Sequence, residues 1–186
     1  MKPVERNQIV DYQTYDERRE SFRMEVFAAK ARRRIHVGSY LTFLFENPLT
    51  IRYQVQEMMR AERIVREKDI LHELATYNGL LGVEGELGCT LLIEIDDPLE
   101  RDVKLRQWLD LPARVYALME DGTRIRPSVD DSQRSPERLS SVQYLKFPVR
   151  GKVPVAVGTD FAGHEAETRL TDDQRAALAE DLGAAA

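Results

Sequence analysis

Two neighbouring segments, residues 48–66 and 69–81, read as helices whose apolar stripes are each interrupted by a polar side chain. At about 100° of rotation per residue, Glu62 falls near the centre of the first stripe and Asn78 lies among the leucines of the second. Burying a carboxylate or an amide without partners is energetically costly. We therefore expect these two side chains either to satisfy one another or to line a pocket.

Other side chains with chemical potential cluster on the same two segments. Two carboxylates and an amide of the first segment could share one wall of a cavity that the second segment completes. Carboxylates in apolar surroundings have raised pKa values and can act as general acids or bases. The candidate pocket comprises Gln54, Glu57, Glu62, Glu73, Tyr77 and Asn78.

Carboxylates also ligate hard metal ions, and a histidine among them would favour iron, manganese or zinc over calcium. The candidate ligands of a divalent metal are Glu57, Glu62 and His72. Neither the repeated Glu-x-x-His pattern of diiron bundles nor the His-Glu-x-x-His pattern of zinc peptidases is present. His72 also projects away from the apolar stripe, so we favour an exposed or hydrogen-bonding role for it. For Glu62 and Asn78 we favour a buried polar pair, with an arginine of residues 60–66 neutralising the acid, over a functional pocket.

Local patterns predict the elements around this helix pair. Apolar residues at helical spacing predict a helix over 16–34, and capping residues mark three further helix starts. These starts are Asn47-Pro48, Asp97-Pro98, and Thr171 with Gln174. Strands are expected at 35–37, 41–46, 87–95, 139–148 and 153–159, and a hairpin at Asp121-Gly122.

These elements predict an α+β fold in which a mixed or largely antiparallel sheet is covered by several helices. The length of 186 residues suits one well-buried domain over 1–186. We expect a short polar segment at the N-terminus and a frayed tail from about residue 183.

The formal charge of -5 and a pI near 5.4 argue against a general nucleic-acid binder, which needs a positive field. No apolar run approaches the length of a membrane span, and the first residues lack the apolar core of a secretory signal. We therefore expect a cytoplasmic protein without membrane insertion. Homo-oligomerisation stays open.

Cys89 is the sole cysteine, which excludes an internal disulfide and an all-cysteine iron–sulfur cluster within one chain. The alternation of residues 87–95 places it on the apolar face of a strand, where we expect a small buried hydrophobe and not a nucleophile. A basic run, Lys30 with Arg32, Arg33 and Arg34, ends the first helix. We favour a solvated helix end there over an anion-binding patch.

Five phrases resemble the bacterial proteins grouped as domain-of-unknown-function family 3501. They are LTFLFEN, VQEMMRAERI (55–64), HELATYN (72–78), GELGCTLLIEI (85–95) and SSVQYLKFP (140–148). The resemblance implies a redox or peroxide-defence setting, because genes of this family lie beside those for rubrerythrin-like diiron proteins and iron–sulfur oxidoreductases. It therefore implies such proteins as partners.

We predict an accessory or interaction protein of a cytoplasmic redox system, working through a surface of the 48–81 helix pair. The alternative is an enzyme, or a protein that binds a metal or a small ligand, using the acidic pocket on that pair. A sensor would share the pocket but lack turnover. Replacing Glu62 with glutamine would abolish turnover in an enzyme, whereas in a structural pair it would chiefly change the melting temperature.

Overall fold

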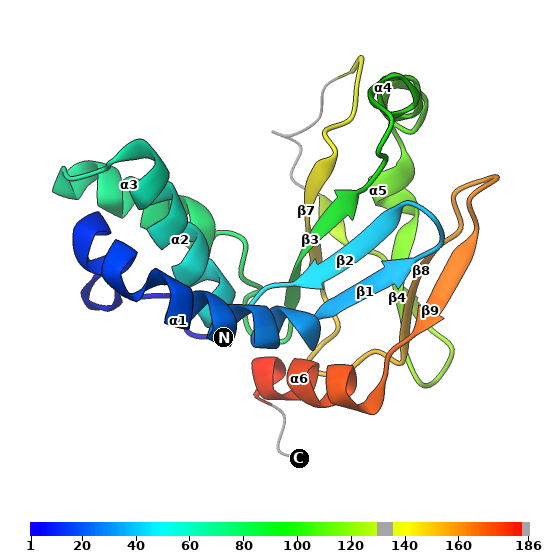
Figure 1. Ribbon diagram of the computed structural model, residues 1–186. Helices are drawn as coiled ribbons and strands as arrows, with labels where there is room; N and C mark the ends of the chain where they lie inside the picture. The colour runs from blue at the N-terminus through cyan, green and yellow to red at the C-terminus, as the bar shows by residue number, and fades with distance from the viewer. Residues whose placement is uncertain (130–135, 184–186) are drawn as a thin grey trace.

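The computed structural model describes residues 1–129 and 136–183 of the protein (Figure 1). Its helices are η1 (Arg6–Gln8), α1 (Tyr12–Ala31), α2 (Pro48–Glu62), α3 (Glu67–Asn78), α4 (Pro98–Gln107), α5 (Leu111–Arg114) and α6 (Asp172–Leu182). Its strands are β1 (Arg34–Val37), β2 (Leu41–Phe45), β3 (Leu87–Ile93), β4 (Val115–Leu118), β5 (Arg124–Ile125), β6 (Ser128–Val129), β7 (Val142–Phe147), β8 (Ala156–Thr159) and β9 (Ala166–Arg169).

The strands form two antiparallel sheets, ordered β1-β2-β3-β7-β6 and β5-β4-β8-β9. The α+β class is confirmed, although the strands divide between two sheets where the sequence pattern suggested one. Strand β9 was not expected, since residues 166–169 alternate between half-buried and exposed positions and carry little apolar signal. The hairpin at Asp121-Gly122 forms, with Gly122 at φ 82°, but the paired residues nearest the turn, Leu118 and Arg124, enclose a five-residue loop.

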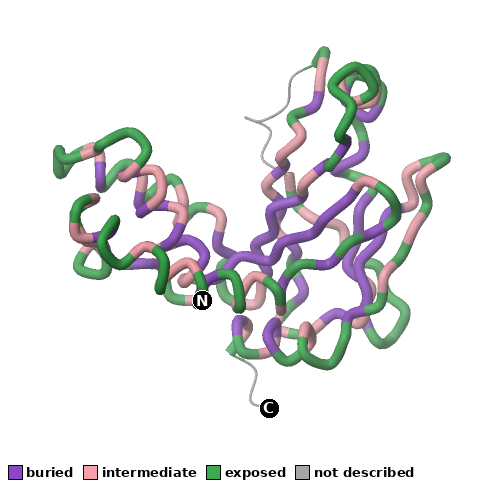
Figure 2. Tube along the Cα trace, viewed as in Figure 1, coloured by how far each residue is buried: buried purple, intermediate pink, exposed green. Residues whose placement is uncertain are grey.

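One hydrophobic core is shared by the two sheets and α6. The core face predicted for the third strand is confirmed, because Leu87, Cys89, Leu91 and Ile93 are all buried in this core. Its other face is also largely covered, so burial does not alternate along the strand. Neighbouring β2 is buried along its whole length, as the tube in Figure 2 shows. Trp108 and helix α4 close one end of the core.

Helices α1, α2 and α3 stand to one side of the sheets (Figure 1), and α2 and α3 have a hydrophobic core of their own. The N-terminal segment belongs to this helical core, since Val4 and Ile9 are 3% and 4% exposed. Residues 1–11 are therefore not the merely polar segment that composition suggested. The presence of two separate cores leaves the single domain a prediction.

The helix starts lie where capping chemistry placed them. Asn47 accepts a hydrogen bond from the backbone N–H of Thr50 ahead of Pro48, and Thr171 with Gln174 forms a capping box at the start of α6. No helix within the described residues is long and apolar enough to cross a membrane. The tail expected to fray falls largely on residues 184–186, outside the described residues.

Candidate functional site

Glu62 is exposed to solvent and is the last residue of α2, so the prediction that it is buried in an apolar stripe was wrong. The chain turns directly after it, at Arg63, which has the left-handed φ of 53°. The stripe that is buried runs through Ile51, Val55 and Met59 and stops before Glu62. Val65, which the pattern placed on the same stripe, is 70% exposed.

Asn78 is half-buried, and its partner is the main chain of the N-terminal segment. Its Oδ1 accepts the backbone N–H of Val4 at 2.8 Å, and its Nδ2 donates to the Val4 carbonyl at 2.9 Å. Gln56 on α2 holds Val10 in the same way, with distances of 2.8 and 3.1 Å. These two amide clamps satisfy the polar groups that interrupt the helical core. Asn78 therefore has a structural role, but with the backbone and not with Glu62.

Glu57 is bound by two residues of α1. Tyr15 donates its hydroxyl at 2.5 Å, and Arg19 donates from Nε and Nη2 at 2.7 and 2.9 Å. The Arg19 guanidinium, helped by the Tyr15 hydroxyl, holds the pKa of Glu57 below its usual range. Burial, with the bond to Glu57, raises the pKa of Tyr15. A carboxylate that stays ionised and fully engaged is a poor general base at neutral pH.

The remaining candidates do not converge with Glu57. Gln54, Glu73 and Tyr77 are half-buried, with Tyr77 packed against the helical core, and His72 is exposed. Across the described residues, no three His, Cys, Asp or Glu side chains are placed to hold a metal ion together. The suggested ligands Glu57, Glu62 and His72 are therefore not assembled into one site.

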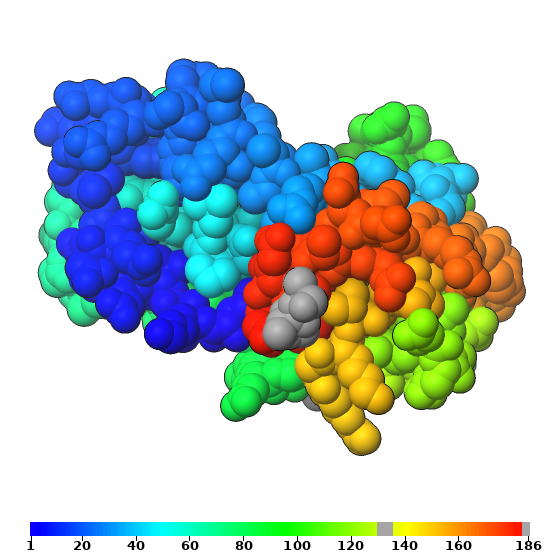
Figure 3. Space-filling model, turned by 90° about the horizontal axis from the view of Figure 1, so that it is seen from below, coloured from blue at the N-terminus to red at the C-terminus, as the bar shows by residue number. Residues whose placement is uncertain are grey.

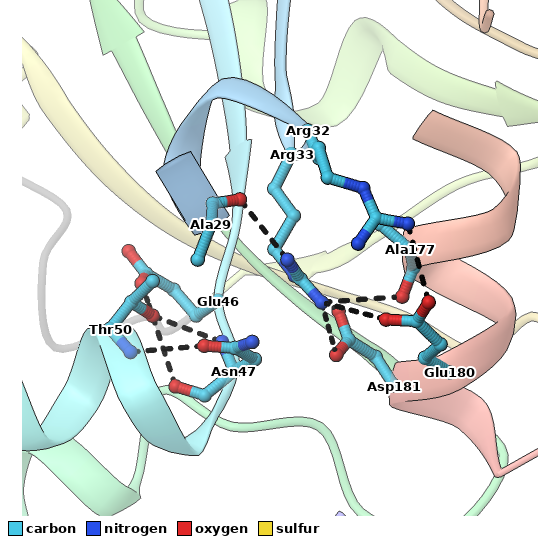
Figure 4. A network of polar contacts seen from close by, with 9 residues as sticks. All are labelled: Ala29, Arg32, Arg33, Glu46, Asn47, Thr50, Ala177, Glu180 and Asp181. Carbon is cyan, nitrogen blue, oxygen red and sulfur yellow. Dashed lines mark hydrogen bonds and ion pairs between the residues drawn. The ribbon is translucent and has the colours of Figure 1, made fainter. Parts of the chain in front are cut away.

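Two arginines of the basic run at the end of α1, Arg32 and Arg33, bind helix α6. Arg33 is buried and forms a bidentate ion pair with Asp181 of α6, with Nε and Nη2 at 2.7 and 2.9 Å from the carboxylate (Figure 4). Arg32 reaches Glu180 on the same helix at 3.2 Å. These pairs fix α6 to the end of α1, which the expectation of a solvated helix end did not anticipate.

Glu46 is a buried carboxylate that sequence reasoning missed. Its two oxygens accept the hydroxyls of Thr50 and Thr90 at 2.5 and 2.6 Å. Figure 4 shows Glu46 with Thr50 beside the Asn47 cap. It precedes the first turn of α2, where the helix dipole favours negative charge. Glu46 joins the end of β2, the start of α2 and β3, and we read it as a joint between the helices and the sheet. Its position directly before the Asn-Pro cap was the available signal.

Cys89 is buried, as expected. Burial, together with the nearby Glu46 carboxylate, raises the pKa of its thiol well above the usual range. A buried thiol with a raised pKa is a poor nucleophile at neutral pH. The interpretation of Cys89 as a core residue is confirmed.

An open groove of about 600 Å³ lies where α1 meets β1. Its lining residues are Phe27, Lys30, Ala31, Arg34 and His36. Phe27 is 49% exposed. Burial lowers the pKa of Lys30, an effect that the Glu46 carboxylate opposes. The groove thus combines apolar side chains, Phe27 and Ala31, with cationic ones, Lys30 and Arg34.

Comparison with known proteins supports the resemblance seen in the sequence. Residues 3–182 match the model of a family described as protein of unknown function, DUF3501. A crystal structure titled novel protein of unknown function, from Burkholderia pseudomallei K96243, has a TM-score of 0.89 at 28% identity, over 97% of this chain and 100% of that chain. Curated proteins gave no match. The protein belongs to the DUF3501 family.

Proposed function

We propose that this protein is an accessory protein of a redox system, and that it docks an acidic segment of a partner protein in the groove between α1 and β1. The observation that carries the proposal is a groove lined by both apolar and cationic side chains, Phe27 and Ala31 with Lys30 and Arg34. The partner classes suggested by the family resemblance are rubrerythrin-like proteins and iron–sulfur oxidoreductases. The partner supplies the redox chemistry, because the thiol of Cys89 is buried and its pKa is raised.

The charges of the groove favour an acidic partner. Across the described residues, Lys30 and Arg34 form no ion pair, whereas Arg32 and Arg33 are both paired with α6. Lys30 does contact the ring of Tyr53, with its ammonium 5.2 Å from the ring centroid, but this contact leaves its charge uncompensated. The whole chain has a formal charge of -5, so two cations gathered at one groove are a local departure from its charge. Such a patch steers an acidic surface towards itself.

The apolar side chains of the groove provide an anchor for the same partner. Phe27 is 49% exposed, and Met24, one turn earlier on α1, is 74% exposed. Large apolar side chains exposed together and rimmed by charge are typical of protein interaction sites. The helix pair suggested by the sequence is the weaker candidate surface, because Arg60 is already paired with Asp16 at 2.5 Å.

The test compares two charge reversals of equal size. The groove variant is Lys30→Glu/Arg34→Glu, and the control is Arg63→Glu/Lys68→Glu on the exposed end of the helix pair. Binding of a purified rubrerythrin-like protein from the same organism is measured by biolayer interferometry at low and high salt. We expect salt-sensitive binding that the groove variant loses and the control retains.

A third variant, Phe27→Ser, separates anchoring from charge. It should weaken binding while leaving the salt dependence unchanged, because it removes apolar area and no cation. Equal binding by all variants would refute the groove as the docking site. Equal loss in both charge reversals would mean that only overall charge matters.

A further inference from the structure

A second concave site lies nearer the start of α1 than the docking groove does, between that helix, α2 and the N-terminal segment. It has a volume of about 340 Å³, within the usual range for small-molecule sites. Figure 3 shows the surface of α2 between α1 and the N-terminal segment on this face. The lining residues are Gln8, Val10, Tyr15, Arg18, Ser21, Phe22, Glu25, Arg52 and Gln56. None of them lines the groove at β1.

The walls of this α1–α2 cavity are fixed by contacts already made. The Gln56 amide clamps Val10 on one side, and Tyr15, 3% exposed, is tied to Glu57 on the other. The ring of Phe22 packs edge-on against Tyr15, with centroids 6.1 Å apart. A ligand would thus meet a preformed surface, which lowers the entropy cost of binding.

Two guanidinium groups in this cavity have no acidic partner among the residues that the structure describes. Arg18 and Arg52 form no ion pair within residues 1–129 and 136–183, whereas neighbouring Arg19 is bound to Glu57. The Arg52 guanidinium lies over the ring of Phe22 at 4.4 Å. Stacking occupies the face of a guanidinium and leaves its N–H donors free in the plane, where they can bind an oxyanion.

The one acidic residue of the lining does not cancel these charges. Glu25 lies seven residues after Arg18 on α1, roughly 10 Å further along the helix axis. It forms no ion pair with a described residue. The cavity therefore has two cations against one carboxylate, next to the half-buried ring of Phe22.

We propose that the α1–α2 cavity binds a small organic anion, a carboxylate or a phosphate monoester with a flat apolar body. Arg18 and Arg52 bind the oxyanion, and the ring of Phe22 packs against the body. This cationic cavity differs from the acidic pocket expected from the sequence, and it shares no lining residue with the docking groove. It gives the protein a ligand site in addition to a docking site.

The experiment titrates benzoate and phenyl phosphate into the full chain by isothermal calorimetry, with neutral benzamide as the uncharged analogue. At least one anion should bind with 1:1 stoichiometry, and benzamide should not. The variant Arg18→Gln/Arg52→Gln should weaken binding about tenfold or more, because charge-assisted hydrogen bonds are lost. The control Arg63→Gln/Arg66→Gln removes the same charge from an exposed loop and should leave affinity unchanged.

Two more variants complete the test. Phe22→Leu should weaken phenyl phosphate and leave any binding of inorganic phosphate unchanged, since only the former has a body that packs on the ring. The groove variant Lys30→Glu/Arg34→Glu should retain anion binding, which separates this site from the proposed docking function. Thermal melts confirm that each variant is folded. The inference is overturned if neither anion binds the folded wild type at millimolar concentration, if benzamide binds equally well, or if both arginine pairs cause the same loss.

Discussion

Replacing Asn78 with alanine should loosen the N-terminal segment from the helical core. The substitution removes both hydrogen bonds between the Asn78 amide and the main chain of Val4. At about 1 kcal/mol net for each bond, the free energy of unfolding should fall by about 2 kcal/mol. In a chain of 186 residues, each kcal/mol lowers the melting temperature by about 2–4 °C, so we expect a drop of about 4–8 °C.

The second clamp makes this prediction sharper. Gln56→Ala removes the equivalent pair of bonds to Val10, six residues along the same segment. If each amide holds only the backbone that it binds, the losses in the free energy of unfolding from the two substitutions add to about 4 kcal/mol. If losing one clamp frees the whole segment, the double variant should be little worse than the poorer single variant, because Val4 and Ile9 are already released.

Hydrogen exchange provides the direct readout. The backbone amide of Val4 donates to Asn78, so its protection should fall sharply in Asn78→Ala while that of Leu91 in the sheet core is unchanged. Thr76→Ala, two residues earlier on the exposed side of α3, controls for the higher helix propensity of alanine. An unchanged melting temperature together with unchanged protection at Val4 would refute the clamp.

Three further predictions concern the ion pairs and the thiol. Arg33→Ala should cost about 3–5 kcal/mol in thermal or urea unfolding, since it leaves Asp181 buried without its partner; a loss below about 1 kcal/mol would show that the pair is dispensable. Because Arg19 lowers the pKa of Glu57, the stabilisation by this carboxylate is complete above the ordinary glutamate pKa of about 4.3 and disappears as the pH falls through the lower folded value. Glu57→Gln should therefore lower the melting temperature at pH 7 and flatten its decline in acid, and parallel pH profiles would contradict this. The raised pKa and burial of Cys89 predict no reaction with a disulfide reagent in the native state and a reaction rate that follows unfolding in urea; fast labelling without denaturant would be the opposite result.

Local chemistry accounts for the parts of the fold that the sequence predicted well. Asn47 before Pro48 places the start of α2 because its side chain binds a free helix amide. The alternation over residues 87–95 places β3 because the side chains of one face, from Leu87 to Ile93, enter the core shared by both sheets. Each of these rules needs only residues within a few positions of one another.

The end of α2 shows why the stripe of Glu62 was misread. The backbone N–H of Ile64 bonds to the carbonyl of Met59 at 2.9 Å, and Arg63 adopts the left-handed conformation that usually signals a glycine. No glycine or proline marks the end of this helix in the sequence, so the apolar pattern predicts that the helix continues to residue 66. The role of the N-terminal segment was invisible for a different reason. Val4 and Ile9 belong to short apolar interruptions of a polar stretch, and nothing local connects them to α2 or α3.

The chemical type of an interrupting polar residue carries more information than its position on a helix. A side-chain amide has both an N–H donor group and a carbonyl acceptor, which match the C=O and N–H of an extended backbone residue, and both Asn78 and Gln56 are used in this way. A carboxylate has only acceptors, so inside the protein it needs donors such as the hydroxyls that reach Glu46 or the guanidinium and hydroxyl that reach Glu57. A side-chain amide within an apolar stripe therefore predicts that an extended backbone segment lies against the helix at that position. Arg18 and Arg52, which form no ion pair with the described part of the chain and which no apolar stripe reveals, are the stronger sign of a ligand.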